Sequence, residues 1–121
     1  MGFQMTLFEQ LVLAAANRES LALRALTLEF LAQNATLEDI AQPNFSDPLQ
    51  LAIAAGLLEL FAARRGQTAP AWVKQFYSPR PFFLVAAALR MPRLRKLCET
   101  QAPPELLKRG LFAPPNFLEF A

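Results

Sequence analysis

The stretch Ser46-Asp-Pro-Leu-Gln-Leu-Ala-Ile-Ala-Ala-Gly-Leu-Leu-Glu-Leu-Phe-Ala-Ala-Arg-Arg-Gly66 decides how this chain folds. Serine and aspartate are preferred helix caps, and Pro48 near the first helical position gives up no hydrogen bond that the helix needs. Apolar residues occupy most sides of the turns that follow, a pattern typical of a buried helix. The arginines suit the negative end of the helix dipole, and Gly66 suits a left-handed cap. We predict a central helix over about residues 47–65.

Two helices are predicted on the N-terminal side of this segment. The first covers about residues 6–16, where Thr6 and Glu9 have the spacing of a capping box. The second runs from residue 17 or 20 to about residue 33. Its predicted apolar stripe consists of Leu21, Ala25, Leu28 and Leu31, widened by Leu23, Leu26 and Phe30. Residues 36–39 open a short helix that the next proline ends.

The second half of the chain is divided by eight prolines, against two before residue 50. Because proline favours the first turn of a helix, they predict a series of short helices. These cover about residues 71–76, 81–90, 92–101, 104–109 and 116–120. Strand-like alternation and hairpin signals are missing from the sequence. The predicted fold class is therefore all-α, a compact bundle of five to seven helices that forms one domain over residues 1–121.

Composition excludes several classes of function. Hydrophobic residues make up 54% of the 121 residues and charged residues 18%, which rules out intrinsic disorder. The chain has no histidine, the commonest general base and metal ligand, and only four glycines, too few for a phosphate-binding loop. Cys98 is the only cysteine and is expected to be a small buried residue. We predict no catalytic activity, no metal and no cofactor.

The charge is distributed unevenly along the chain. Residues 1–63 hold two bases and seven acids, a net charge of −5, whereas residues 64–121 hold ten bases and three acids, a net charge of +7. The two halves therefore attract each other or a second copy, or the basic half faces phosphates. Four cations crowd into seven residues, namely Arg90, Arg93, Arg95 and Lys96. That helix either lies along a phosphate backbone, faces an acidic protein or is simply solvated.

Two further expectations concern the membrane and the C-terminal tail. The longest uncharged run in the apolar middle, residues 48–58, is too short to span a bilayer. The first eleven residues contain no basic side chain of the kind that begins a signal peptide, so we expect a cytoplasmic protein. The phenylalanine-rich tail, residues 111–121, either wraps over the domain or presents an apolar surface to a partner.

The C-terminal half carries a recognisable pattern: Ala69-Pro-Ala-Trp72, Pro81-Phe-Phe-Leu, Arg90-Met-Pro-Arg-Leu-Arg-Lys, Ala102-Pro-Pro-Glu-Leu-Leu-Lys-Arg109 and Leu111-Phe-Ala-Pro-Pro-Asn-Phe-Leu118. Over residues 69–120 it resembles a family of short, uncharacterised bacterial helical proteins. Members are often encoded beside a nucleotidyltransferase-like partner, in pairs interpreted as toxin–antitoxin modules. This chain has Gly110 where the family pattern has asparagine. The resemblance implies a partner protein rather than an active site.

These observations predict a non-catalytic, antitoxin-like protein-interaction module that binds a protein partner or associates with itself, as a homodimer for example. Binding hot spots favour tryptophan and arginine surrounded by apolar contacts. The predicted partner-binding residues are Trp72, Arg90, Arg93, Arg109, Phe112 and Phe117. The alternative is a small nucleic-acid-binding regulator that uses the basic helix over residues 90–96.

Overall fold

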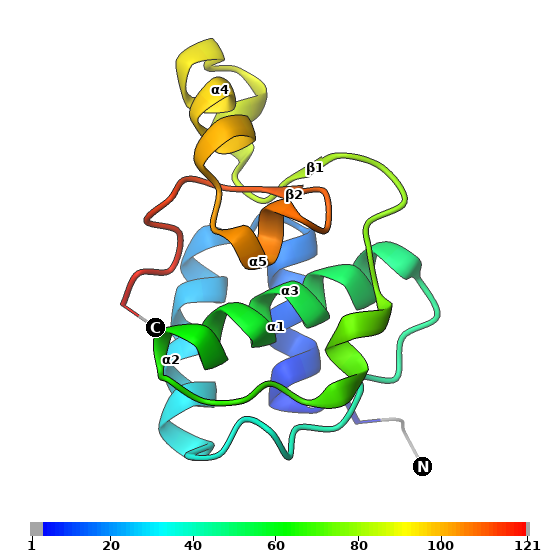
Figure 1. Cartoon of the computed structure of the whole chain (residues 1–121). Coiled ribbons are helices and arrows are strands. Elements are labelled where there is room, and N and C mark those ends of the chain that lie inside the picture. Colours follow the sequence, from blue (N-terminus) through cyan, green and yellow to red (C-terminus); the bar gives the residue numbers. More distant parts are fainter. Residues whose placement is uncertain (1–3, 121) are drawn as a thin grey trace.

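Helix α3 (Pro48–Arg64) lies at the centre of the main core in the computed structural model, which describes residues 4–120. The Asp47 carboxylate accepts a hydrogen bond from the Leu49 amide at 2.9 Å, and Gly66 ends the helix region with a φ of +64°. All but a few of its side chains are buried. Figure 1 shows α3 crossing the middle of the molecule, so the predicted central helix is confirmed.

Helices α1 (Leu7–Ala16) and α2 (Ser20–Gln33) form a hairpin that packs against α3. The Thr6 hydroxyl accepts a hydrogen bond from the Glu9 amide at 3.1 Å, and the Glu9 carboxylate accepts one from the Thr6 amide at 2.9 Å. This is the predicted capping box. Arg18 turns the chain between the helices with a φ of +56°.

The second half consists of short elements, as its prolines predict. They are η1 (Ala71–Gln75), β1 (Phe82–Phe83), η2 (Ala86–Leu89), α4 (Pro92–Gln101), α5 (Pro104–Leu107) and β2 (Leu111–Phe112), where η marks a 3₁₀ helix. The five α helices in residues 4–120 confirm the all-α class. Strands β1 and β2 add one short parallel pairing, in which Phe82 is opposite Leu111.

Four local predictions were wrong in whole or in part. The segment 81–90 is not a continuous helix but β1 followed by η2, because its backbone pairs with β2. Residues 36–39 and 116–120 form turns rather than helices. The predicted apolar stripe of α2 is only partly buried, since Leu31 lies in the core but Leu21 is 85% exposed and Leu28 is 47% exposed.

Gly56 sets how closely α5 approaches α3. A Cβ atom at this position would lie 2.9 Å from Leu106 Cδ2 and 3.1 Å from Leu111 Cδ1. Both distances are shorter than ordinary van der Waals contact, so a larger residue would have to displace the ends of these two buried side chains. The close contact at Gly56 brings residues 106–111 onto the main core.

Residues 83–101 project from the helical body, and we call this segment the α4 projection. In Figure 1 it stands above α3 and α5, away from the three long helices. It has a small apolar cluster of its own, in which Phe83, Ala88 and Cys98 are buried. The rings of Phe83 and Phe112 lie 5.1 Å apart between the projection and β2. The projection is therefore joined to the body through its β1–β2 base.

Candidate functional site

The six predicted partner-binding residues do not form one surface. Arg90 and Arg93 are exposed on the α4 projection. Arg109 is only 2% exposed, and Phe117 is buried against the main core. Trp72 and Phe112 are partly buried and pack against the main core and the small cluster, respectively. The structure therefore separates two exposed cations from residues whose contacts lie inside the chain.

Arg109 joins three elements from a buried position. Its Nη1 atom donates to Glu59 Oε1 at 2.7 Å and to the Glu105 carbonyl at 2.8 Å. Its Nη2 atom donates to the Val73 carbonyl at 2.5 Å, and the guanidinium lies 5.9 Å from the Tyr77 ring centroid. The side chain therefore ties α5 to α3 and η1.

The carboxylate of Glu59 is shared by two cations. Lys108 Nζ and Arg109 Nη1 both lie 2.7 Å from Glu59 Oε1. Burial tends to raise the pKa of Glu59, but the hydrogen bonds and charges of these two residues outweigh it and lower the pKa overall. The negative charge of Glu59 and its Oε1 atom are thus both engaged in contacts within the chain.

Trp72 has a structural contact of its own. Its indole Nε1 donates to the carbonyl of Ile40 at 2.8 Å, and its ring lies 6.3 Å from that of Phe76. A buried indole N–H normally finds such an acceptor. Trp72 therefore fastens η1 to the loop between α2 and α3.

The C-terminal tail wraps over the helices, which was one of the two expectations for it. Phe117 is buried, and Arg64 donates a hydrogen bond to the Leu118 carbonyl. The guanidinium of Arg24 lies 4.5 Å from the centroid of the Phe120 ring. The tail through residue 120 is thus packed on α2 and α3 instead of lying free.

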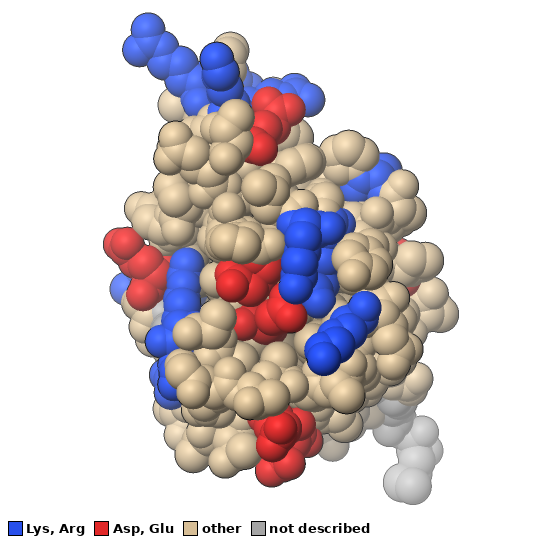
Figure 2. All heavy atoms as spheres, in the orientation of Figure 1, with Lys and Arg blue, Asp and Glu red and all other residues tan. Residues whose placement is uncertain are grey.

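Four exposed cations gather on the α4 projection. Figure 2 shows lysine and arginine at the tip of this segment, in the orientation of Figure 1. All four members of the predicted basic cluster are exposed, namely Arg90, Arg93, Arg95 and Lys96. Glu99 is the only acidic residue in 83–101. A shallow hollow of about 270 Å³ lies between Arg93, Lys96 and the end of α4.

Two exposed apolar side chains lie beside these cations. Leu89 and Met91 flank Arg90 and are about half exposed. Sequence reasoning missed them, although Met91 comes immediately before Pro92, where a chain entering a helix is extended rather than helical. The tip of the projection therefore combines basic side chains with exposed apolar ones.

Arg18 holds the base of the projection. Its Nε atom donates to the Phe83 carbonyl at 2.7 Å, and its guanidinium lies 4.4 Å from the centroid of the Phe82 ring. A single arginine in a helix–helix turn gave no sequence signal for this contact 65 residues away. The contact fixes the start of the projection against the α1–α2 hairpin.

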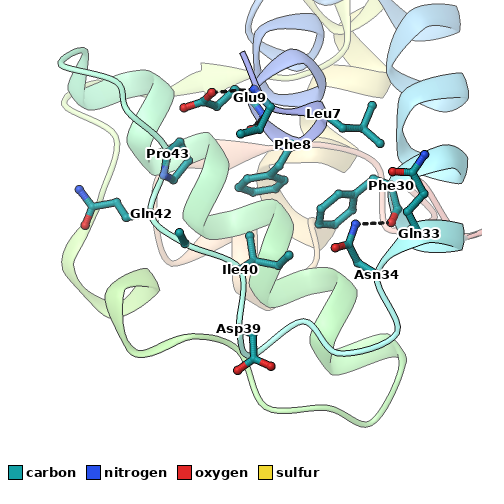
Figure 3. Close-up of a pocket in the computed structure, with 12 residues that line it drawn as sticks. Leu7, Phe8, Glu9, Phe30, Gln33, Asn34, Asp39, Ile40, Gln42 and Pro43 are labelled. Atoms are coloured by element: carbon teal, nitrogen blue, oxygen red, sulfur yellow. Dashed lines mark hydrogen bonds between the residues drawn. The ribbon is translucent and has the colours of Figure 1, made fainter. Parts of the chain in front are cut away.

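A hollow of about 330 Å³ beside the start of α1 is shown in Figure 3. Phe8 and Phe30 line it, with ring centroids 5.2 Å apart. The buried Glu9 carboxylate accepts hydrogen bonds from the amides of Thr6 and Asn44, at 2.9 and 2.7 Å. Burial tends to raise the pKa of Glu9, but these bonds outweigh it and lower the pKa overall. Both carboxylate oxygens of Glu9 thus accept hydrogen bonds from the backbone, one of them from the loop at Asn44.

Cys98 is buried in the small cluster of the projection, as expected. Burial, and then the charge of Glu99, raise the pKa of its thiol. A thiol with a raised pKa is a weak nucleophile, because the thiolate is the reactive form. Within residues 4–120, no three cysteine or acidic side chains come together as a metal site.

No protein-family model, curated protein or solved structure matches this chain. Across the part of the chain that the structure describes, no helix is long and apolar enough to cross a membrane. The features left for a functional inference are the exposed surfaces, among them the tip of the α4 projection with its four cations in seven residues.

Proposed function

We propose that this chain is a non-catalytic interaction module, antitoxin-like in role, that binds an acidic surface of a partner protein through the α4 projection. One observation carries the proposal: four exposed cations occupy seven residues on a segment that stands away from the body. A cluster of one sign attracts the opposite charge and steers its approach. The proposed setting is the bacterial cytoplasm, where a lone cysteine stays reduced.

The tip of the projection has the composition of a protein interface. Arginine and methionine are enriched where proteins meet, and apolar side chains exclude water around charged hot spots. Met91 and Leu89 provide such contacts beside Arg90. Exposed apolar side chains do not contribute to binding phosphate groups. Their presence at the tip therefore favours a protein partner over a nucleic acid.

The projection is also held in one conformation before any partner binds. The β1–β2 pairing fixes its base, Arg18 bonds the Phe83 carbonyl, and Pro92 starts α4. A preformed binding segment loses less conformational entropy on association. The structural contacts of Arg109, Trp72 and Phe117 support this arrangement from within the chain.

Co-expression with the product of the neighbouring reading frame tests the proposal. Arg90→Glu/Arg93→Glu reverses two exposed charges, so we expect it to weaken the complex by at least about tenfold in isothermal calorimetry. Lys74→Glu is the matched control, because Lys74 is an exposed cation on η1, outside the projection. Equal affinity of the double variant and the wild type would contradict the proposal, provided that circular dichroism shows both folded.

The second candidate function is nucleic-acid binding through the same helix, favoured by the near absence of acidic residues from the projection. A duplex DNA oligonucleotide distinguishes the two. If Arg90, Arg93, Arg95 and Lys96 contact phosphates, the logarithm of the affinity falls with the logarithm of salt concentration, with a slope of about −3 to −4. Weak binding that is the same for the charge-reversed variant excludes this candidate.

A further inference from the structure

The outward face of α2 carries an apolar stripe that no other segment within residues 4–120 covers. Leu21 is 85% exposed and Leu28 is 47% exposed, and Ala25 and Ala32 between and beyond them are exposed as well. The stripe advances by four, three and four residues, which is the spacing of one seam of a coiled coil. The four side chains therefore lie on one line along about three turns of the helix.

The opposite face of the same helix already packs against the core of its own chain. Leu23, Phe30 and Leu31 are buried in the main core on the opposite side of α2. Helix α2 is thus apolar on two faces, although only one of them contacts the body. An apolar stripe on a helix normally faces a packing partner. The uncovered face therefore indicates a second packing surface.

Charged residues on the two flanks of the stripe indicate which kind of partner binds it. In heptad positions, Arg24 falls at g and Glu29 falls at e, five residues further along. In a parallel pair of helices, g of one chain faces e of the other with this offset, so Arg24 meets Glu29 of the second copy twice. In an antiparallel pair g positions face g positions and e positions face e positions, so Arg24 and Glu29 would not meet. Arg24 is already held at the side of the stripe by its contact with Phe120, at 4.5 Å.

We propose that two copies of this chain associate through the outward faces of α2, with the helices parallel. Leu21 and Leu28 pack against their counterparts, with Ala25 and Ala32 in the alternating layers. A helix of 14 residues is about 21 Å long. An interface of this length, with alanine in half of its layers, is smaller than a standard interface, so we expect a dissociation constant in the range of roughly 1–100 μM.

The α2 surface is separate from the α4 projection. Arg18, just before α2, bonds the base of the projection, so the N-terminal end of α2 lies near it. A parallel dimer therefore carries both projections at the same end. If the proposed function holds, such a dimer presents two basic tips to one partner assembly, which raises the effective affinity. The dimer itself does not depend on that function.

Sedimentation velocity of the whole chain, from about 1 to 500 μM, measures the association. We expect a concentration-dependent shift from monomer to dimer for the wild type. Leu21→Gln/Leu28→Gln should raise the dissociation constant at least about tenfold and leave the melting temperature at low concentration unchanged. Leu89→Gln is the matched control, an exposed leucine outside α2, and should dimerise like the wild type.

Charge exchange tests the parallel arrangement. Arg24→Glu and Glu29→Arg should each weaken the dimer, because each places like charges opposite each other, and the double exchange should restore it. A chain that stays monomeric throughout, or a glutamine variant that dimerises like the wild type, overturns the α2 interface. A dimer that the double exchange does not restore overturns its parallel geometry.

Discussion

Replacement of Arg109 by alanine is expected to lower the free energy of unfolding by about 3–5 kcal/mol, the usual cost of removing one partner of a buried ion pair. The side chain is only 2% exposed, and its loss leaves the Val73 and Glu105 carbonyls without their donor. Unfolding in urea, followed by circular dichroism, measures the change. Since total stability is typically about 5–15 kcal/mol, the variant should be close to unfolding at 37 °C.

Lys108→Ala is the matched control, because Lys108 contacts the same Glu59 oxygen at the same distance of 2.7 Å. Lys108 is 51% exposed, so solvent screens its charge and its loss should cost less than about 1 kcal/mol. The lowered pKa of Glu59 provides a second measurement. The charged Glu59 carboxylate stabilises the folded protein fully above about pH 4.3, and this stabilisation is lost as pH falls further. Equal effects of the two variants would show that burial of Arg109 contributes nothing.

Leu57→Ala is expected to destabilise the chain by about 2–5 kcal/mol, the range for truncation of a buried leucine. Leu57 is fully buried in α3, which packs against α1, α5 and η1. The three elements cannot all move inward to fill the space, so a cavity remains. Urea unfolding measures the loss.

The same substitution at a surface leucine is the control for the loss of these side-chain atoms. Leu89→Ala removes the same atoms from a side chain that is about half exposed on the α4 projection, and should cost less than about 1 kcal/mol. If Leu57→Ala costs no more than Leu89→Ala, α3 is not the centre of the core.

The parts of the fold that could be predicted depend on local chemistry. The Thr6–Glu9 box, the Asp47–Pro48 start and the Gly66 end each use interactions within a few residues, and each appears in the structure where the sequence places it. The burial of α3 followed from its apolar character on most sides. Such signals need no knowledge of distant segments.

The parts that could not be predicted depend on distant contacts. Residues 82–83 are extended because they pair with residues 111–112, almost thirty positions away, and no local pattern encodes that pairing. In α2 both faces are apolar, so periodicity identified the helix but could not decide whether Leu21 or Leu23 faces the core. The sequence showed which side chains share a face, not which face the body covers.

The same limit applies to the predicted binding residues. Hot-spot chemistry selected Arg93 and Arg109 alike, because an arginine suited to an interface is also suited to a buried ion pair. Only the fold distinguishes them: Arg93 is exposed on the α4 projection, and Arg109 lies beneath the contacts of α3, α5 and η1. Burial of the tail similarly makes Phe117 a core residue.

The affinity of the neighbouring gene product for Arg93→Glu and Phe117→Ala, measured by calorimetry beside each variant's melting temperature, tests the central claim most directly. We expect Arg93→Glu to weaken binding by about tenfold at an unchanged melting temperature, because its side chain is exposed. Phe117→Ala should lower the melting temperature, because its ring is buried, and should leave the affinity of the folded protein unchanged. Loss of binding in folded Phe117→Ala, with wild-type binding in Arg93→Glu, would contradict the assignment of partner binding to the α4 projection.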